Sequence, residues 1–198
     1  TDALINALDK TKSTPHIIFS SSIQESSNTA YGVSKKESSL KLQKFSKLKN
    51  LKFTSLIIPN VFGPFCKPYY NSVIATFCHQ IINEKVPKIE TDSSLKLIYV
   101  DELIMAIIKS FEQTEIIKVV RIPFSMQMKV SKILNYIKSF KSSYIQNGDI
   151  PNLKDPFIKN LFTTFLCYLN YNEIYPMKLK INADNRGSFV ETMKLKSG

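Results

Sequence analysis

The stretch from residue 16 to residue 42, HIIFSSSIQESSNTAYGVSKKESSLKL, constrains the fold of this chain more than any other. It begins with an apolar, partly β-branched run, continues through three serines and a polar loop, and ends in a lysine-rich pattern with helical spacing. This order predicts a buried strand at 16–19, a strand end that carries the serines, and a helix from about 30 to 47. Tyr31 and Lys35 are four residues apart, so they would share one face of that helix.

The pairing of Tyr31 with Lys35 next to the serines can carry proton-transfer chemistry. A phenol titrates near pH 10, and a neighbouring ammonium favours the phenolate, which eases proton exchange at neutral pH. A serine hydroxyl at the end of the preceding strand could bind the oxygen atom that Tyr31 protonates. Such a set suits a carbonyl group that accepts hydride, or the reverse oxidation. An ordinary solvated helix start also explains the spacing, because a lysine-rich chain with nine tyrosines has about one Tyr-x-x-x-Lys by chance.

Size and composition bound the class of protein. The 198 residues suffice for one sizeable domain, and 43% apolar with 22% charged residues indicates a globular chain. No apolar run approaches the ~20 residues of a membrane span and no signal peptide is visible, so we expect a cytoplasmic protein without a membrane partner. Cys66, Cys78 and Cys167 lack metal-ligand spacing and indicate reduced thiols; no metal site is expected.

The net charge of +11 comes almost entirely from lysine. A charge of this size favours polyanions as partners. A lysine-biased composition also explains it, because lysines occur on every predicted helix surface and no arginine–aromatic recognition motif is present. We therefore do not expect nucleic acid as the partner, although a nucleotide-sugar diphosphate would benefit from the positive field.

Helical and strand patterns alternate along the chain, which predicts a parallel sheet with crossover helices. Ligands of such sheets bind at the carboxyl ends of the strands, where Ser22 and Asn60 would both lie. The other expected helices are at 1–12, 70–83, 102–111, 130–140 and 157–169, and the other expected strands are at 51–58, 96–100 and 116–122. We expect Asp101 to be the N-cap of the helix at 102–111.

The segments SSSIQ and YGVSK resemble the active-site segment of extended short-chain dehydrogenases/reductases, the NAD-dependent epimerase/dehydratase family. Carried over by position, the resemblance implies Ser22, Tyr31 and Lys35 as the catalytic set. It also implies that Tyr31 and Lys35 contact a nicotinamide cofactor, NADPH or NADH.

The resemblance continues through the middle of the chain. The segment IIPNVFGP matches the family's strand end and Gly-Pro turn, which implies that the backbone at Ile58 and Pro59 faces the nicotinamide and that Asn60 touches the sugar nucleotide. The segment YYNSVIATFCHQI resembles the start of the substrate-binding helix, where Asn71 would contact the nucleotide.

The segment LKLIYVDEL departs from the pattern that it otherwise resembles. Leu95 stands where the family often has an arginine that grips a phosphate. Lys96 would have to bind the substrate in its place, and a lysine point charge is not equivalent to an arginine fork.

The last third of the chain, together with one earlier segment, resembles one subgroup of this family. The segment KLKINADNRGSFVETMK resembles the opening of a cupin β-barrel, and PNVFGPFCKPYYNSVIATFCHQI is similar to the bifunctional capsular-polysaccharide nucleotide-sugar reductases of the CapF type. This implies reduction of a 4-keto UDP-N-acetyl-deoxyhexose with NADPH, and therefore a UDP-sugar substrate. A homodimer is one assembly that the chain could form. It also implies the second half of a Rossmann-type reductase domain at 1–142, a helical extension at 143–176 and a truncated cupin-like start at 177–198.

The glycine-rich turn that seats the cofactor diphosphate is absent from this sequence, which has five glycines. We therefore expect a partial Rossmann-type α/β fold that ends in the first strand of a cupin-like barrel. The chain could be a fragment of a longer protein, a truncated gene product, or a domain completed by another chain. The leading hypothesis is a nucleotide-sugar reductase or a piece of one. The alternatives are a catalytically inactive remnant that acts as a binding or assembly module, and a basic polyanion-binding protein.

Overall fold

The computed structural model describes residues 1–11, 13–112, 114–177, 179–192 and 194–195, and they form two compact units. The first unit comprises Thr1–Val61 and Lys96–Ser125, and the second comprises the described parts of Phe62–Leu95 and Met126–Gly198. The chain passes between the units within strands β3 (Asn60–Phe62) and β4 (Ser94–Tyr99), and again after residue 125.

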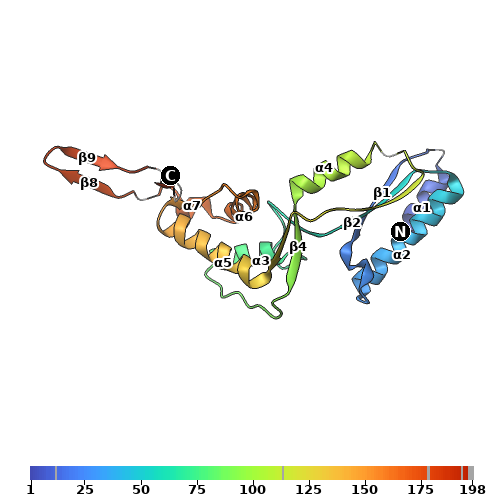
Figure 1. Cartoon of the computed structure of the whole chain (residues 1–198), viewed down its shortest axis with the longest axis horizontal. Helices are drawn as coiled ribbons and strands as arrows, with labels where there is room; N and C mark the ends of the chain where they lie inside the picture. The colour runs from blue at the N-terminus through green and yellow to red at the C-terminus, as the bar shows by residue number, and fades with distance from the viewer. Residues whose placement is uncertain (12, 113, 178, 193, 196–198) are drawn as a thin grey trace. The chain divides into compact units, whose positions relative to one another are not determined.

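The first unit is built on a three-stranded parallel sheet with the order β1–β2–β5. Its strands are β1 (Ile17–Ser22), β2 (Phe53–Ile58) and β5 (Ile117–Arg121). The central strand β2 is buried along its whole length, as expected for a parallel strand with a neighbour on each side and helices on its faces. Crossover helices join the strands of this sheet, as Figure 1 shows for α2 (Ala30–Lys49) between β1 and β2. The α/β fold predicted from the sequence is therefore confirmed.

Helices cover both faces of this sheet. Side chains alternate along β2, and Ser55 faces α2, where Ser39 Oγ donates a hydrogen bond of 3.0 Å to Ser55 Oγ. Leu56 and Ile58 point to the opposite face and pack with Leu103 of α4 (Val100–Ser110). The same apolar cluster includes Ile98 and Ile122, with Ile18, Val61, Ala106, Ile107 and Val120 packed against it.

The amino-terminal helix α1 (Asp2–Lys10) runs along α2 in the same direction. Asp2 pairs with Lys41 at 3.0 Å and Asp9 pairs with Lys49 at 2.5 Å. No residue of α1 is buried, and exposed ion pairs stabilise a fold little. Helix α1 therefore lies at the surface of the first unit.

The structure corrects the expected start of α4. Asp101 was expected to cap this helix, but α4 begins at Val100, so Asp101 lies inside its first turn. Glu102 makes the capping contact instead, because its Oε2 accepts a hydrogen bond of 3.1 Å from the backbone N–H of Tyr99. A carboxylate at the third helical position commonly reaches back in this way.

The second unit packs three helices around an aromatic core. The ring centroids of Phe140 and Phe162 are 5.2 Å apart, and those of Phe140 and Phe165 are 5.8 Å apart. All three rings are buried, and aromatic pairs at this spacing stabilise a core beyond the area that they bury. The three helices are α3 (Val73–Ile82), α5 (Val130–Phe140) and α6 (Pro156–Leu166).

Short elements complete the second unit. The strand β8 (Ile181–Asp184) pairs antiparallel with β9 (Gly187–Val190) in a largely exposed hairpin, and β7 (Asp149–Ile150) pairs parallel with β10 (Lys194–Leu195). That the hairpin opens a cupin-like barrel, and that domains divide at 142/143 and 176/177, stay predictions. The remaining elements are β6 (Met126–Lys129), the π-helix η2 (Lys141–Gln146) and α7 (Tyr171–Ile174).

Two properties of the described residues bear on the class of protein. None of the described helices combines the length and the apolar character needed to cross a bilayer. Nor do the described histidine, cysteine, aspartate and glutamate side chains form a group of three that could hold a metal ion.

Candidate active site

Ser22 is placed at the junction of a strand and a short helix. It is the last residue of β1 and the N-cap of the 3-10 helix η1 (Ile23–Ser26). Its Oγ accepts a hydrogen bond of 3.2 Å from the backbone N–H of Gln24. That bond uses a lone pair of the hydroxyl, so the hydroxyl hydrogen can still be donated to another oxygen atom.

Lys35 joins α2 to the end of β1. Its Nζ donates a hydrogen bond of 2.8 Å to the carbonyl oxygen of Ser20, two residues before Ser22. The same Nζ lies 5.3 Å from the ring centroid of Phe19 and 5.8 Å from that of Tyr31. An ammonium at these distances is attracted to the faces of aromatic rings. The predicted pairing of Lys35 with Tyr31 is therefore present as a contact.

Tyr31 lies on the first turn of α2, and the residue is 47% exposed. The helix start is capped by Thr29, whose Oγ1 accepts a hydrogen bond of 3.1 Å from the Gly32 N–H. Within the described part of the chain, no hydrogen bond joins the Tyr31 hydroxyl to Ser22 or to Lys35. Lys35 thus contacts both the Tyr31 ring and the strand that carries Ser22, without a direct link between tyrosine and serine.

Gly32 allows η1 to approach the first turn of α2 closely. A Cβ atom at this position would lie 2.2 Å from the carbonyl oxygen of Gln24 and 2.6 Å from Ser27 Oγ. Both distances are shorter than any van der Waals contact, so a side chain here would force η1 away from α2. The sequence reasoning missed this role, although a glycine directly after Tyr31 was a signal that could have revealed it.

A second missed contact holds the turn after β1. The buried Ser21 hydroxyl donates a hydrogen bond to the carboxylate of Glu25 in η1. Because Ser21 precedes Ser22 directly, this bond helps to fix the turn that presents the Ser22 hydroxyl. A serine and a glutamate four residues apart are too common in sequences to predict such a bond.

The strand end next to Ser22 carries the predicted cofactor-facing backbone. Ser22 and Ile58 are direct partners in the register of β1 with β2, and the buried Pro59 follows. Asn60 Nδ2 donates a hydrogen bond of 3.1 Å to the Lys96 carbonyl oxygen, and Lys96 Nζ lies 5.3 Å from the Phe124 ring centroid. Asn60 and Lys96, predicted separately as substrate-binding residues, are therefore neighbours in the first unit.

Asn71 belongs to the second unit and lines a cavity of about 830 Å³. Its backbone has a positive φ of 57°, and that of Tyr69 has a φ of 59°. Side chains from the loop before α3, from α3 and from the segment after it share the lining, among them Tyr69, Ser72, Gln80, Lys85 and Lys88. Asn71 is thus the one predicted site residue that lies in the second unit.

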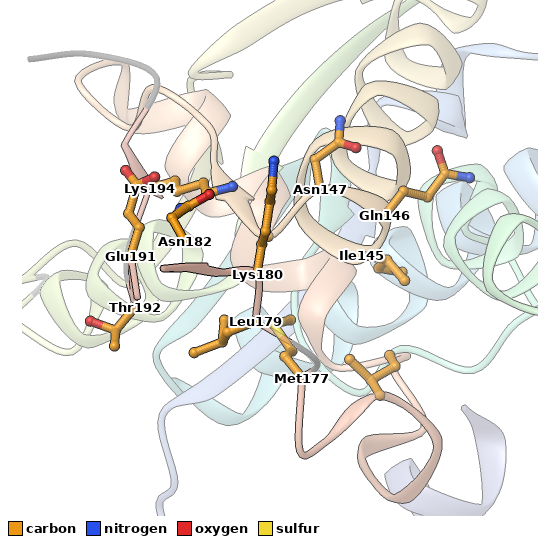
Figure 2. Close-up of a pocket in the computed structure, with 12 residues that line it drawn as sticks. Ile145, Gln146, Asn147, Met177, Leu179, Lys180, Asn182, Glu191, Thr192 and Lys194 are labelled. Atoms are coloured by element: carbon orange, nitrogen blue, oxygen red, sulfur yellow. The ribbon is translucent and has the colours of Figure 1, made fainter. Parts of the chain in front are cut away.

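A further cavity of the second unit, of about 430 Å³, is lined by none of the predicted site residues. In the view of Figure 2, the polar ends of Asn147 and Lys180 point the same way, whereas Met177 and Leu179 lie at the opposite side. The lining of this cavity combines polar and apolar side chains, and Lys194 and Glu191 contribute charges of opposite sign.

Comparison with known proteins identifies a family and a related reductase for this chain. Residues 9–122 match the family described as "NAD dependent epimerase/dehydratase family". A reductase from Pseudomonas aeruginosa, UDP-2-acetamido-2,6-beta-L-arabino-hexul-4-ose reductase, is 27% identical over 180 residues, which are 90% of this chain and 48% of the relative.

Solved structures agree with the sequence match. The capsular polysaccharide assembling protein CapF from Staphylococcus aureus is 32% identical with a TM-score of 0.86, over 98% of this chain and 53% of CapF. A UDP-N-acetylglucosamine 4-epimerase from Methanobrevibacter ruminantium is 25% identical with a TM-score of 0.63, over 77% of this chain and 62% of the epimerase. The chain spans about half the length of the Pseudomonas reductase and of CapF. It belongs to the NAD-dependent epimerase/dehydratase family.

Proposed function

We propose that this chain is part of a nicotinamide-dependent nucleotide-sugar reductase, with Tyr31 as proton donor and Ser22 as the group that binds the carbonyl oxygen. The observation that carries the proposal is the position of Lys35, which contacts both the Tyr31 ring and the backbone of β1 two residues before Ser22. The names of two relatives, a hexul-4-ose reductase and a capsular polysaccharide assembling protein, support a 4-keto UDP-N-acetyl-deoxyhexose substrate in capsular or surface polysaccharide synthesis.

The residues of the first unit fit the nicotinamide-ribose side of such a cofactor. Ligands of parallel α/β sheets bind at the carboxyl ends of the strands, and β1 and β2 end side by side at Ser22 and Ile58. The hydroxyl of the exposed Tyr31 and the Lys35 ammonium offer a hydrogen-bond donor and a positive charge at the start of α2. When bound, the cofactor supplies a hydride to the carbonyl carbon.

Each of the three side chains has a separate role in this proposal. Tyr31 delivers a proton to the carbonyl oxygen, and Ser22 donates a hydrogen bond to the same oxygen. Lys35 orients Tyr31 and binds the ribose hydroxyls. The bond from Gln24 N–H to Ser22 Oγ supports the role of Ser22, because it leaves the hydroxyl hydrogen of this serine to be donated.

Nucleotide-sugar contacts are assigned separately in each unit, to Asn60 and Lys96 in the first and to Asn71 in the second. Asn60 and Lys96 lie together in the first unit, and Lys96 brings a positive charge suited to phosphate. Asn71 lines the cavity of about 830 Å³ in the second unit, a volume within the range of small-ligand sites. Lys85 and Lys88 line the same cavity and suit a polyphosphate ligand.

The decisive experiment is a titration of the chain with NADPH and with NADH, followed by nicotinamide fluorescence. Saturable binding that Lys35→Met weakens and Lys36→Met leaves intact supports the proposal, since Lys36 is exposed on the same helix. Failure of both cofactors to bind a folded sample would favour a catalytically inactive remnant. Binding to duplex DNA that falls steeply with salt would instead favour a polyanion-binding protein.

A further inference from the structure

The cavity of about 830 Å³ in the second unit has an exposed tyrosine in its lining. This residue is Tyr69, and it is 59% exposed. Its neighbour Tyr70 is 66% exposed but does not line the cavity. Most of the surface of a tyrosine belongs to its ring, so an exposed tyrosine in a cavity offers a flat aromatic surface to a ligand.

Both the backbone and the ring of Tyr69 have partners in α3. The Tyr69 N–H donates a hydrogen bond of 2.9 Å to Thr76 Oγ1, and the Tyr69 backbone has a φ of 59°. A residue other than glycine keeps such a backbone conformation only where its surroundings hold it, and the bond to Thr76 is one such restraint. The ring centroid lies 5.6 Å from that of His79, at an interplanar angle of 80°. An edge-to-face contact of this kind leaves at least one face of the Tyr69 ring free of His79, so a positioned ring remains available for a ligand.

One face of α3 adds polar groups to the same cavity. Thr76 and Gln80 both line it and are four residues apart, so they share a face of the helix. The Thr76 hydroxyl has its partners within the chain, because it accepts from Tyr69 and donates a hydrogen bond of 2.8 Å to the Ser72 carbonyl oxygen. Gln80 Oε1, in contrast, is buried without a hydrogen-bond partner in the part of the chain that the structure describes. An unpaired buried acceptor is costly and the terminal torsion of glutamine is soft, so a ligand that brings an N–H group into the cavity is favoured.

The segment after α3 gives the cavity a positive balance of charge. Lys85 and Lys88 both line it, against the single carboxylate of Glu90. The Lys85 N–H donates a hydrogen bond of 2.8 Å to the Gln80 carbonyl oxygen, which fixes the start of this segment at the end of α3. Aromatic surface, an unpaired acceptor and two ammonium groups match the base, the base edge and the phosphates of a nucleotide. Inorganic polyphosphate would use the lysines alone.

We propose that Tyr69 stacks on the base of a nucleoside diphosphate and makes this cavity select ligands that carry an aromatic base. The proposal rests on the proposed function, which assigns nucleotide contacts to the same cavity, and adds a specificity-determining residue to them. Lys85 and Lys88 bind the phosphate oxygens, and Gln80 accepts a hydrogen bond from the base edge. Every base has a flat face, so Tyr69 sets the preference for an aromatic base and not the identity of that base.

The test compares two ligands by calorimetric titration of the full chain. The first is UDP, and the second is dihydro-UDP, in which the carbon–carbon double bond of the uracil ring is saturated. Saturation removes the flat aromatic ring but keeps the carbonyl groups, the ring N–H and the diphosphate. We expect UDP to bind about tenfold or more tightly than dihydro-UDP, since stacking on an aromatic side chain contributes about 1–3 kcal/mol per base, which is about tenfold for each 1.4 kcal/mol. Equal affinities of the two ligands, or no binding of UDP to the folded chain, would overturn the proposal.

Variants of Tyr69 test the same preference from the side of the protein. Tyr69→Leu should lower the affinity for UDP by about tenfold or more and remove the preference over dihydro-UDP. Tyr69→Phe should keep both, because the ring remains, and Tyr70→Leu is the matched control that should bind as the wild-type chain does. A UDP affinity in Tyr69→Leu equal to that of the wild-type chain, or an equal loss in Tyr69→Phe and Tyr69→Leu, would contradict stacking. Circular dichroism checks folding, and if Tyr69→Leu does not fold, the two affinities of the wild-type chain still decide.

This site and the proposed reductase function can fail separately, because UDP contains no nicotinamide. Unchanged UDP affinity in Tyr69→Leu, together with nicotinamide binding that depends on Lys35, would overturn the role of Tyr69 and leave the reductase proposal standing. A preference for UDP that depends on Tyr69, without nicotinamide binding, would support the base-stacking site and overturn the reductase proposal.

Discussion

The ammonium of Lys35 donates a hydrogen bond of 2.8 Å to the carbonyl oxygen of Ser20, and thereby connects the first turns of α2 to the strand that ends at Ser22. This bond gives Lys35 a structural role in addition to its proposed contact with the cofactor ribose. The two roles can be separated because one affects unfolding and the other affects binding.

We predict that Lys35→Met lowers the free energy of unfolding by about 1 kcal/mol, since a charge-assisted bond to a partly exposed carbonyl is lost. The same change should reduce the free energy of NADPH binding by more than it reduces the free energy of unfolding. Urea unfolding and nicotinamide fluorescence measure the two effects. Lys36→Met is the matched control, and equal cofactor affinity of the two variants would contradict the proposed role of Lys35.

Gly32→Ala should destabilise the first unit, because the new Cβ would lie 2.2 Å from the Gln24 carbonyl oxygen. Overpacking of this kind costs about 1–3 kcal/mol, and here it would move η1 away from α2. Urea unfolding measures the loss. Ser34→Ala, at an exposed position of the same helix, should change the stability by less than about 0.5 kcal/mol. Equal stabilities of the two variants would show that η1 does not rest on Gly32.

Tyr31→Phe should leave the fold intact and abolish reduction, because only the hydroxyl that delivers the proton is removed. Loss of a general acid typically lowers a rate by about a hundredfold or more. The measurement is NADPH absorbance during turnover of a 4-keto nucleotide sugar, with urea unfolding as the check on folding. Tyr136→Phe, which removes a hydroxyl in the second unit, is the control. Turnover at the wild-type rate in Tyr31→Phe would reject the assignment of the proton donor.

His16 should make the stability of the first unit depend on pH. Its Nε2 lies 2.8 Å from Thr54 Oγ1, and burial, followed by the charge of Lys52, lowers the pKa of His16 below its usual 6.5. The unfolded chain therefore binds a proton more readily than the folded chain, so stability is lost as the pH falls through 6.5 towards the lowered value.

The His16→Gln variant tests this dependence while keeping a polar partner for Thr54. Between about pH 7 and about pH 5, the urea midpoint of the wild-type chain should fall more steeply than that of the variant. The difference between the two curves reports the imidazole alone. Parallel curves would mean that the His16 imidazole titrates alike in the folded and unfolded chains.

Much of the fold follows from local sequence patterns. The β-branched runs and the spacing of apolar residues were sufficient to predict the strands of the first sheet and the helix at 130–140, which is α5 as observed. Local patterns were less informative at element ends. The apolar run predicted a strand at 16–19 with the serines at its end, and the pairing with β2 shows that the strand itself runs from Ile17 to Ser22. The cap of α4 was assigned to Asp101 for a related reason, since two adjacent acidic residues cannot be distinguished without the observed bond from Tyr99 to Glu102.

The amino-acid sequence by itself determined the alternation of strands and helices, the placement of Ser22 at a strand end, and the spacing that puts Tyr31 and Lys35 on one helix face. These properties depend on residues close together in the chain, where backbone geometry fixes the periodicity. Only the tertiary structure decided that Lys35 binds the Ser20 carbonyl, that η1 rests on Gly32, and that the Tyr168 hydroxyl donates a hydrogen bond to the Cys66 carbonyl oxygen. Such contacts depend on how separate elements pack, and in a close-packed interior that arrangement is set by many side chains at once.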